Sequence, residues 1–184
     1  MGDPEFILLG DSVWLDFVNT GRGRGRGRSG DRLSDAAAYH RWAKASRLRS
    51  DADSVDYAEV RRFRSRLLRL ADALATGMPV PAASITMINR LLHDAQGRQH
   101  LVRESGTWHL AFSPDVTLPA LAAVAHSAAV ALSDPAARVR QCAGAGCTLY
   151  FSHGAADLGQ GRRWCAEAEC GQAGWVERRR GALR

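Results

Sequence analysis

The sequence predicts a chain of two parts: a mainly α N-terminal domain, an orthogonal helix bundle with a small β-hairpin, and a small α+β unit at the C-terminal end. Three observations predict this division. Apolar residues recur at helical spacing in the first two-thirds of the chain, residues 99–112 alternate around a turn, and all four cysteines lie after residue 141. The proline-bearing segment "SDPAA", residues 133–137, marks the expected boundary, which gives domains 1–135 and 136–184.

The first ordered element is expected at "SVWLDFVNT", residues 12–20, which mixes β-branched and aromatic side chains with two polar ones. This pattern fits a strand or the first turns of a buried helix, and the sequence leaves both open. Asp16 and Asn19 lie inside the apolar segment and need hydrogen-bond partners. They either brace the loop that follows or line a ligand-binding pocket.

Residues 21–31, "GRGRGRGRSGD", are expected to form a mobile loop, because glycine at every second position leaves the backbone too free for a helix or strand. The loop carries five arginines when Arg32 is counted. They either grip phosphates or form a solvated loop. The glycine spacing does not match a phosphate-binding glycine loop.

Four helices are expected after this loop. Ser34 is a candidate N-cap for the first, residues 35–49, and the others cover about 54–76, 82–95 and 119–132. The second carries an apolar stripe of Val60, Phe63, Leu67, Leu70 and Leu74. Its opposite face carries Arg61, Arg62, Arg64, Arg66 and Arg69. That face is either a nucleic-acid contact or the solvated side of a surface helix.

A β-hairpin is expected between the third and fourth helices, in residues 99–112, with its turn at Ser105-Gly106. Trp108, Leu110 and Phe112 alternate along its second strand. Because alternate residues of a strand share one face, we expect these three side chains to face the core.

Composition narrows the class of function. The formal charge is +6, but 24 of the 25 basic residues are arginine, a skew that base composition explains as well as an acidic partner does. The histidines are scattered, with no pair four residues apart beside a glutamate, so we expect no enzyme. The first residues do not resemble a signal peptide and no apolar run is long enough to span a bilayer, so a cytoplasmic protein without a membrane partner is expected.

The cysteines form two pairs of one spacing, "CAGAGC" at residues 142–147 and "CAEAEC" at residues 165–170. Free thiols and disulfides are the alternatives, but paired cysteines in a reducing compartment favour a metal. Four thiolates complete a tetrahedral zinc shell and leave no position for a reactive water. The sequence therefore predicts one structural Zn²⁺ with the ligands Cys142, Cys147, Cys165 and Cys170.

The residues around the cysteines predict a treble-clef-like unit. "RVRQC" and "TLYFSH" read as short strands beside the first pair, and residues 166–181 read as a short helix that begins near the last cysteine. A unit this small has little apolar core, so the metal would supply much of its folding free energy, on the order of 10 kcal/mol. Two groups of arginines lie near it and are the candidate DNA contacts: Arg162 and Arg163, and Arg178, Arg179 and Arg180. The second group ends the expected helix, so these arginines either contact DNA or complement the helix dipole.

Taken together, "WLDFVNT", the Arg/Gly loop, the helical middle and "RRWC-x4-CG" resemble the bacterial ABATE-domain proteins that carry a C-terminal CGNR zinc finger. The resemblance covers nearly the whole chain. It implies a mainly α sensing domain joined to a DNA-binding finger in stress-related transcription regulators. The four cysteines match the ligand positions, and Asp16 and Asn19 match polar positions of the N-terminal motif.

One departure from the family pattern lies in the tetrad that gives the finger its name. Gln172 and Ala173 stand where the family has asparagine and arginine, which predicts weakened DNA binding. A Zn(Cys)4 centre also carries a formal charge of −2 and lowers the positive charge of the finger. Two hypotheses therefore remain: a DNA-binding regulator with a small-molecule or protein effector at its N-terminal domain, or a zinc-stabilised protein-interaction module without DNA binding.

Overall fold

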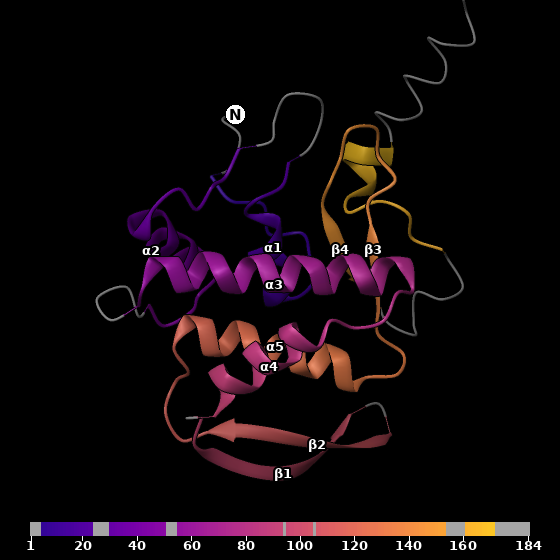
Figure 1. The fold of residues 1–184 in the computed structure, drawn as a ribbon. Coiled ribbons are helices and arrows are strands. Elements are labelled where there is room, and N and C mark those ends of the chain that lie inside the picture. The colour runs from indigo at the N-terminus through magenta and orange to yellow at the C-terminus, as the bar shows by residue number, and fades with distance from the viewer. Residues whose placement is uncertain are drawn as a thin grey trace, which may run out of the picture.

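The computed structural model describes six stretches of the chain: residues 5–23, 30–50, 55–93, 95–104, 106–153 and 161–171. Within them it contains five α-helices and two separate antiparallel hairpins, an α+β arrangement (Figure 1). The helices are α1 (Val13–Asn19), α2 (Ala36–Ala45), α3 (Tyr57–Thr76), α4 (Ala82–Leu92) and α5 (Ala120–Ser133). The strands are β1 (Gly97–Glu104), β2 (Thr107–Pro114), β3 (Arg138–Gln141) and β4 (Tyr150–His153).

Helix α1 settles the alternative that the sequence left open at residues 12–20. It is short but almost entirely buried, and Trp14, Leu15 and Phe17 have no exposed surface. Its position explains its ambiguous pattern, because a helix covered on all sides shows no polar stripe. Contacts with α3, α5 and β4 surround it.

Helix α2 starts one residue later than the candidate cap predicts. Asp35, not Ser34, is the N-cap, and its Oδ1 accepts a 2.7 Å hydrogen bond from the Ala38 N–H. The carboxylate satisfies one of the free N–H groups of the first turn. On the buried face of the helix, Tyr39 and Trp42 pack against Phe17 of α1, with the Trp42 and Phe17 ring centroids 5.0 Å apart.

Helix α3 is the longest element and crosses the middle of the molecule (Figure 1). The predicted apolar stripe is confirmed, since Val60, Phe63, Leu67 and Leu70 are buried and Leu74 packs at the edge of the core. Gly77 ends the helix in the left-handed conformation, at φ 70°, which glycine adopts without the steric cost of a Cβ. Helices α4 and α5 cover the lower side of this core (Figure 1).

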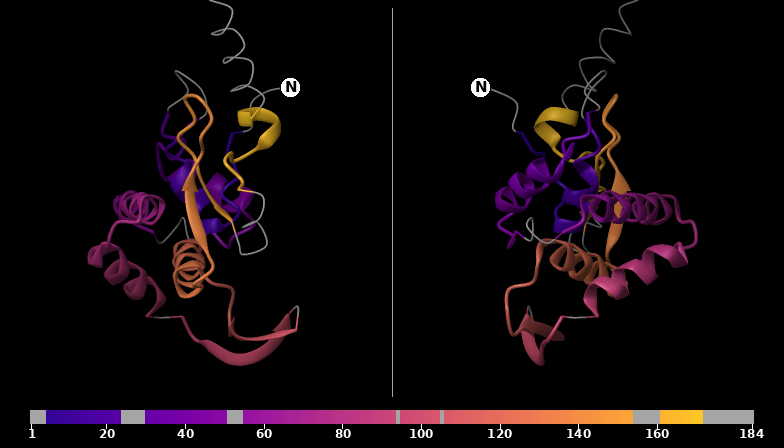
Figure 2. Two further views of the ribbon diagram at one scale, coloured as in Figure 1. Left: turned by 90° about the vertical axis from the view of Figure 1, so that its right-hand side faces the viewer. Right: turned by 60° about the vertical axis from the view of Figure 1, so that its left-hand side comes forward.

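The β1–β2 hairpin is present, with Glu104 paired to Thr107 on either side of the expected turn. The predicted orientation of its second strand is wrong, because Trp108 is 62% exposed and Leu110 is 65% exposed. Only Phe112, near the base of the hairpin, is half-buried, and its ring lies 5.8 Å from that of His126 on α5. The hairpin extends away from the helices that hold its base (Figure 2). The alternation of residues therefore places these side chains on one face of the strand, but no described element covers most of that face.

The β3–β4 hairpin connects the helical core to the cysteine region. It pairs Gln141 with Tyr150, and it packs on α3 through β3 and on α1 through β4. Val139 and Tyr150 belong to the core of the helices, whereas Leu149 and Phe151 belong to a second apolar cluster around the cysteines. Because neighbouring residues of a strand point to opposite faces, this short hairpin contributes to both clusters.

Among the described residues, no helix is long and apolar enough to cross a membrane.

Candidate metal centre

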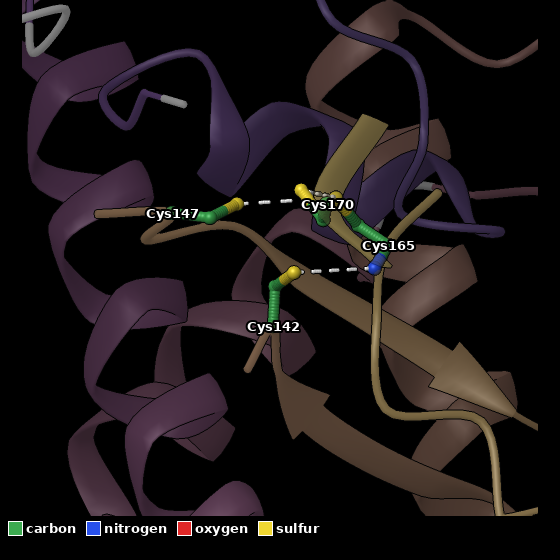
Figure 3. A group of neighbouring side chains, drawn as sticks. All are labelled: Cys142, Cys147, Cys165 and Cys170. Carbon is green, nitrogen blue, oxygen red and sulfur yellow. Dashed lines mark hydrogen bonds between the residues drawn. The ribbon is translucent and has the colours of Figure 1, made fainter. Parts of the chain in front are cut away.

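The four cysteine sulfurs converge on one point, and each lies within 4.8 Å of the other three. Cys142 and Cys147 come from the segment that joins β3 to β4, and Cys165 and Cys170 come from residues 161–171 (Figure 3). All four side chains are buried and none forms a disulfide. The cluster predicted from the repeated spacing is therefore formed, and its residues can hold a metal ion.

The sulfur separations fit a tetrahedral ion. Metal–sulfur bonds of about 2.3 Å in a tetrahedron place the sulfurs about 3.8 Å apart. The Cys147 and Cys165 Sγ atoms are 3.9 Å apart, and the Cys165 and Cys170 Sγ atoms are 3.6 Å apart. These two Sγ–Sγ distances are close to those of a tetrahedral four-sulfur site, consistent with one zinc site.

Backbone N–H groups support one of the ligands. Cys142 Sγ accepts hydrogen bonds from the Gly144 N–H at 3.4 Å and from the Cys165 N–H at 3.3 Å. Such donors stabilise negative charge on a thiolate and fix the direction of its lone pairs. Because Cys165 is itself a ligand, this contact also links the two halves of the site.

Two glycines shape the turn between the first two ligands. At Gly144, a Cβ would lie 2.8 Å from the Cys170 Cβ and 3.1 Å from its Sγ, so a side chain would collide with the fourth ligand. Gly146 has φ 72°, the left-handed region that glycine favours. These two positions let the chain return in time for the Cys147 N–H to bond the Gly144 carbonyl at 3.0 Å.

The acid–base behaviour of the thiols shows that a cation is needed if all four are to be ionised. Hydrogen bonds from the Cys147 and Cys165 thiols lower the pKa of Cys142 to about 2. The bond to Cys142 raises the pKa of Cys147, and burial raises the pKa of Cys170 to about 12. Mutual repulsion of like charges opposes ionising neighbouring thiols together, and a divalent ion would compensate the charge of four thiolates.

The polypeptide that carries the first cysteine pair is bonded to α1. The Asn19 side chain, 1% exposed, donates to the Tyr150 carbonyl at 2.8 Å and accepts from the Tyr150 N–H at 2.9 Å. Of the two roles that the sequence left open for Asn19, bracing therefore has a visible partner, which is β4 and not the following loop. The ligand-binding role of Asn19 stays a prediction.

Asp16 lies one helical turn before Asn19 but has a different partner. Its Oδ1 accepts a 2.7 Å hydrogen bond from the Gly10 N–H. Burial raises the pKa of Asp16 to about 6, against the lowering effect of that bond. Asp16 thus holds the segment that precedes α1, and its role as a ligand-binding residue is also still a prediction.

Both ends of the Arg/Gly loop are held, the first by the cysteine hairpin and the second by α3, although the middle of the loop, residues 24–29, lies outside the described residues. Gly23 and Thr148 exchange hydrogen bonds, with the Thr148 N–H 3.0 Å from the Gly23 carbonyl. The Arg22 guanidinium donates to the Thr148 carbonyl and lies 4.6 Å from the centre of the Tyr150 ring. At the other end of the loop, Asp31 accepts two hydrogen bonds from Arg64.

The two described arginines among the candidate DNA contacts differ. Arg162 donates to Asp11 at 2.7 Å and to the Cys165 carbonyl at 2.6 Å, and its guanidinium lies 4.6 Å from the Phe151 ring centre. Arg163 is exposed, with its guanidinium 5.8 Å from the ring centre of Trp164. The other three candidates, Arg178, Arg179 and Arg180, lie outside the described residues, as does the Gln172-Ala173 departure.

The sequence did not reveal Asp11, Arg22 and Thr148 as parts of this region. Each is bonded to a residue more than 120 positions away, so no local spacing could pair them. The only available signal was the polar character of Asp11 and Arg22 beside an apolar segment.

A protein family matches this chain. The model of the ABATE family matches residues 11–135, more than half of the chain. The chain belongs to the ABATE family. Its description is "putative stress-induced transcription regulator", which confirms the resemblance drawn from the N-terminal motif. No curated protein matches this ABATE protein.

The matched range ends before the first cysteine, so it covers the helices and not the metal ligands of this ABATE protein. The case for a metal centre therefore depends on the sulfur geometry alone. Of the cysteine region, the structure describes both strands and one short π-helical turn, η2 (Glu167–Gly171), which contains the last ligand. The rest of the predicted terminal helix lies outside the described residues.

Proposed function

We propose that the protein is a non-enzymatic transcription regulator that binds duplex DNA and whose C-terminal part is held together by one structural Zn²⁺. The observation that carries the proposal is the set of four buried sulfurs within 4.8 Å, in a chain whose family is described as regulating transcription. Four cysteine ligands leave no open position on the metal, so its contribution is folding free energy and not catalysis.

Zinc is the metal that the donor set favours. Thiolates are soft ligands, and four of them in a tetrahedron suit Zn²⁺, which is redox-inactive. The Sγ–Sγ separations of 3.6 and 3.9 Å agree with zinc–sulfur bonds. The parts, a β3–β4 hairpin whose connecting segment carries two ligands and a later helical turn with the fourth ligand, support a treble-clef-like unit. In this unit Cys142, Cys147, Cys165 and Cys170 would hold the ion.

Exposed arginine supports the DNA contact. Arg163 and Arg140 lie at the surface next to the centre, while Arg162 holds the finger to the segment before α1 through Asp11. We therefore assign phosphate contact to Arg163 and to the terminal arginines, which are Arg178, Arg179 and Arg180. For Arg162 we assign a positioning role in addition to the DNA contact predicted from the sequence. The helical domain would respond to a small-molecule or protein effector.

The test combines metal analysis with DNA titration. Elemental analysis of the purified chain should find about one zinc per molecule, and Cys165→Ser should lose most of it. Fluorescence anisotropy with a duplex should show affinity that falls steeply with salt, by about 0.9 log units per phosphate contact for each tenfold increase. Cys165→Ser should bind the duplex more weakly at every salt concentration.

One observation favours the alternative of a protein-interaction module. Nε, Nη1 and Nη2 of Arg162 all donate to groups within the chain. If the protein contains zinc but shows no affinity for duplex DNA even at low salt, the regulator hypothesis fails and the interaction module is favoured. If the chain contains no metal, the structural zinc is rejected.

A further inference from the structure

A groove between α3 and α4 concentrates positive charge. It has a volume of about 770 Å³ and is lined by residues of these two helices alone. Its lining consists of Ala58, Arg61, Arg62, Ser65, Arg66, Arg69, Ala83, Thr86, Met87 and Arg90. Five of the ten are arginines and none is acidic, so the lining has a single sign of charge.

Among the described residues, three of these arginines form no ion pair, although Asp31 lies near enough to Arg61 to interact with its charge. Arg62 pairs with Asp56 at 3.2 Å and Arg90 pairs with Glu59. Within the described part of the chain, the guanidinium groups of Arg61, Arg66 and Arg69 make no hydrogen bond or ion pair. Several like charges along one concave surface repel one another, and an anion bound between them would relieve that repulsion.

The groove is fixed by contacts between the two helices. Ser84 of α4, which has no exposed surface, donates a 2.8 Å hydrogen bond to the Arg66 carbonyl of α3. The Arg90–Glu59 pair joins the other end of α4 to the start of α3. The helices therefore run antiparallel in a set register, which fixes the backbone positions from which the arginine side chains extend.

The shape of the groove indicates an extended ligand. Along α3 the lining runs from Ala58 to Arg69, about 16 Å at 1.5 Å per residue. Arg62, Arg66 and Arg69 lie at helical spacing on one face, so neighbouring side chains start about 5–6 Å apart. On one strand of duplex DNA a phosphate occurs every 3.4 Å along the axis, so this length faces four or five phosphates.

The lining also disfavours a small nucleotide. It contains no tryptophan, tyrosine, phenylalanine or histidine on which a base could stack, and all five arginines are exposed. Small-molecule sites usually enclose most of their ligand and contact its rings. A backbone of phosphates needs only guanidinium forks along its path, because each fork matches two phosphate oxygens.

From this charge, register and shape we propose that the α3–α4 groove is a second DNA-contact surface, which binds the phosphate backbone of a duplex without reading its sequence. The inference rests on the proposed function, because it takes duplex DNA as the partner, but it assigns the contact to the helical domain. Arg61, Arg66 and Arg69 bind phosphates, and Arg62 and Arg90 flank them.

The experiment compares two triple variants of equal charge. In the groove variant, Arg61, Arg66 and Arg69 are changed to glutamine, which has nearly the helix propensity of arginine. In the control variant, Arg41, Arg98 and Arg103, three exposed arginines outside the groove, are changed to glutamine. Far-UV circular dichroism and thermal unfolding first establish that both variants fold as the wild type does.

Fluorescence anisotropy with a 20-base-pair duplex is then measured from low to moderate salt. The salt slope, log K against log salt, should lose about 0.9 per broken contact in the groove variant, so up to about 2.7, and change little in the control. Equal slopes for both variants, with DNA binding retained, would overturn the groove and leave the finger as the contact.

Further arms separate this inference from the proposed function. If Cys165→Ser binds DNA like the wild type but the groove variant does not, the groove inference holds and the finger contact fails. If the wild type does not bind the duplex at all, both fail. If ATP, as a probe of nucleoside polyphosphates, binds the wild type and not the groove variant while duplex affinity is unchanged, the groove is a small-ligand site and the DNA assignment is wrong.

Discussion

At the scale of single residues, Gly144 is the glycine whose missing side chain leaves room for a metal ligand. Changing Gly144 to alanine places a Cβ 2.8 Å from the Cys170 Cβ and 3.1 Å from its sulfur. Contacts this short force the fourth ligand away from the other three. We expect Gly144→Ala to bind clearly less than one zinc per chain in elemental analysis.

Gly30 provides the matched control, since an added Cβ there meets no atom within 4 Å. Gly30→Ala should keep the wild-type zinc content. Full zinc content in Gly144→Ala would mean that the turn between Cys142 and Cys147 adjusts without cost, and the packing argument would be wrong.

Asp16 predicts a pH dependence of stability. Its pKa rises from 3.8 to about 6 on folding because burial disfavours the charged carboxylate. A folded-state pKa above the unfolded one means that the native state binds the extra proton between these values. The free energy of unfolding should therefore fall by about 2 kcal/mol from pH 4 to pH 6 through this group, and level off near pH 7.

Asp16→Asn removes the titrating proton and keeps an oxygen that can accept from the Gly10 N–H. Urea unfolding of both proteins at pH 4, 5, 6 and 7 should show the variant gaining on the wild type as pH rises, with the gain nearly complete at pH 7. A stability difference that is the same at all four pH values would show that the Asp16 carboxylate is not destabilised by burial.

At the scale of elements, strand β2 and helix α2 differ in how far their tryptophans are covered. The β1–β2 hairpin exposes Trp108, whereas Trp42 of α2 has no exposed surface. Trp108→Ala should change the free energy of unfolding by no more than about 0.5 kcal/mol, while Trp42→Ala should cost about 3–5 kcal/mol because it leaves a cavity. Urea unfolding of the two variants measures both values. A large loss for Trp108→Ala would mean that its face is covered in solution.

Helix α3 and strand β2 show what the sequence can and cannot predict. The 3.6-residue period of α3 carries its own evidence of burial, so its stripe from Val60 to Leu74 could be read directly. The two-residue period of β2 shows only that Trp108, Leu110 and Phe112 share a face. Whether another element covers that face depends on where the hairpin is attached, and no local pattern records this.

The candidate site divides in the same way. Four cysteines at a repeated spacing predicted their own convergence, because ligands of one ion must meet. The contact of Arg162 with Asp11 was not predictable, since it joins residues 151 positions apart. The groove was missed for a related reason: the arginines of α3 were visible, but their concave setting depends on the approach of α4.

At the scale of the whole molecule, the cysteine region and the β1–β2 hairpin occupy opposite ends, with the helices between them (Figure 2). The β3–β4 hairpin joins the first of these ends to the helical core, because Val139 and Tyr150 pack among the helices. Loss of the metal should therefore disorder the ligand turns before it disturbs α3, whose apolar stripe is buried by other helices.

The pairing of Asn19 with Tyr150 has a consequence for how the chain is made. The amide of Asn19 lies within the first helix, and its partner is synthesised 131 residues later. While the ribosome is still adding the helices between them, this buried amide must remain in water, so α1 cannot take its final place. A nascent chain stopped before residue 150 should therefore be an incompletely folded species that depends on chaperones, even though its family-defining segment is already complete.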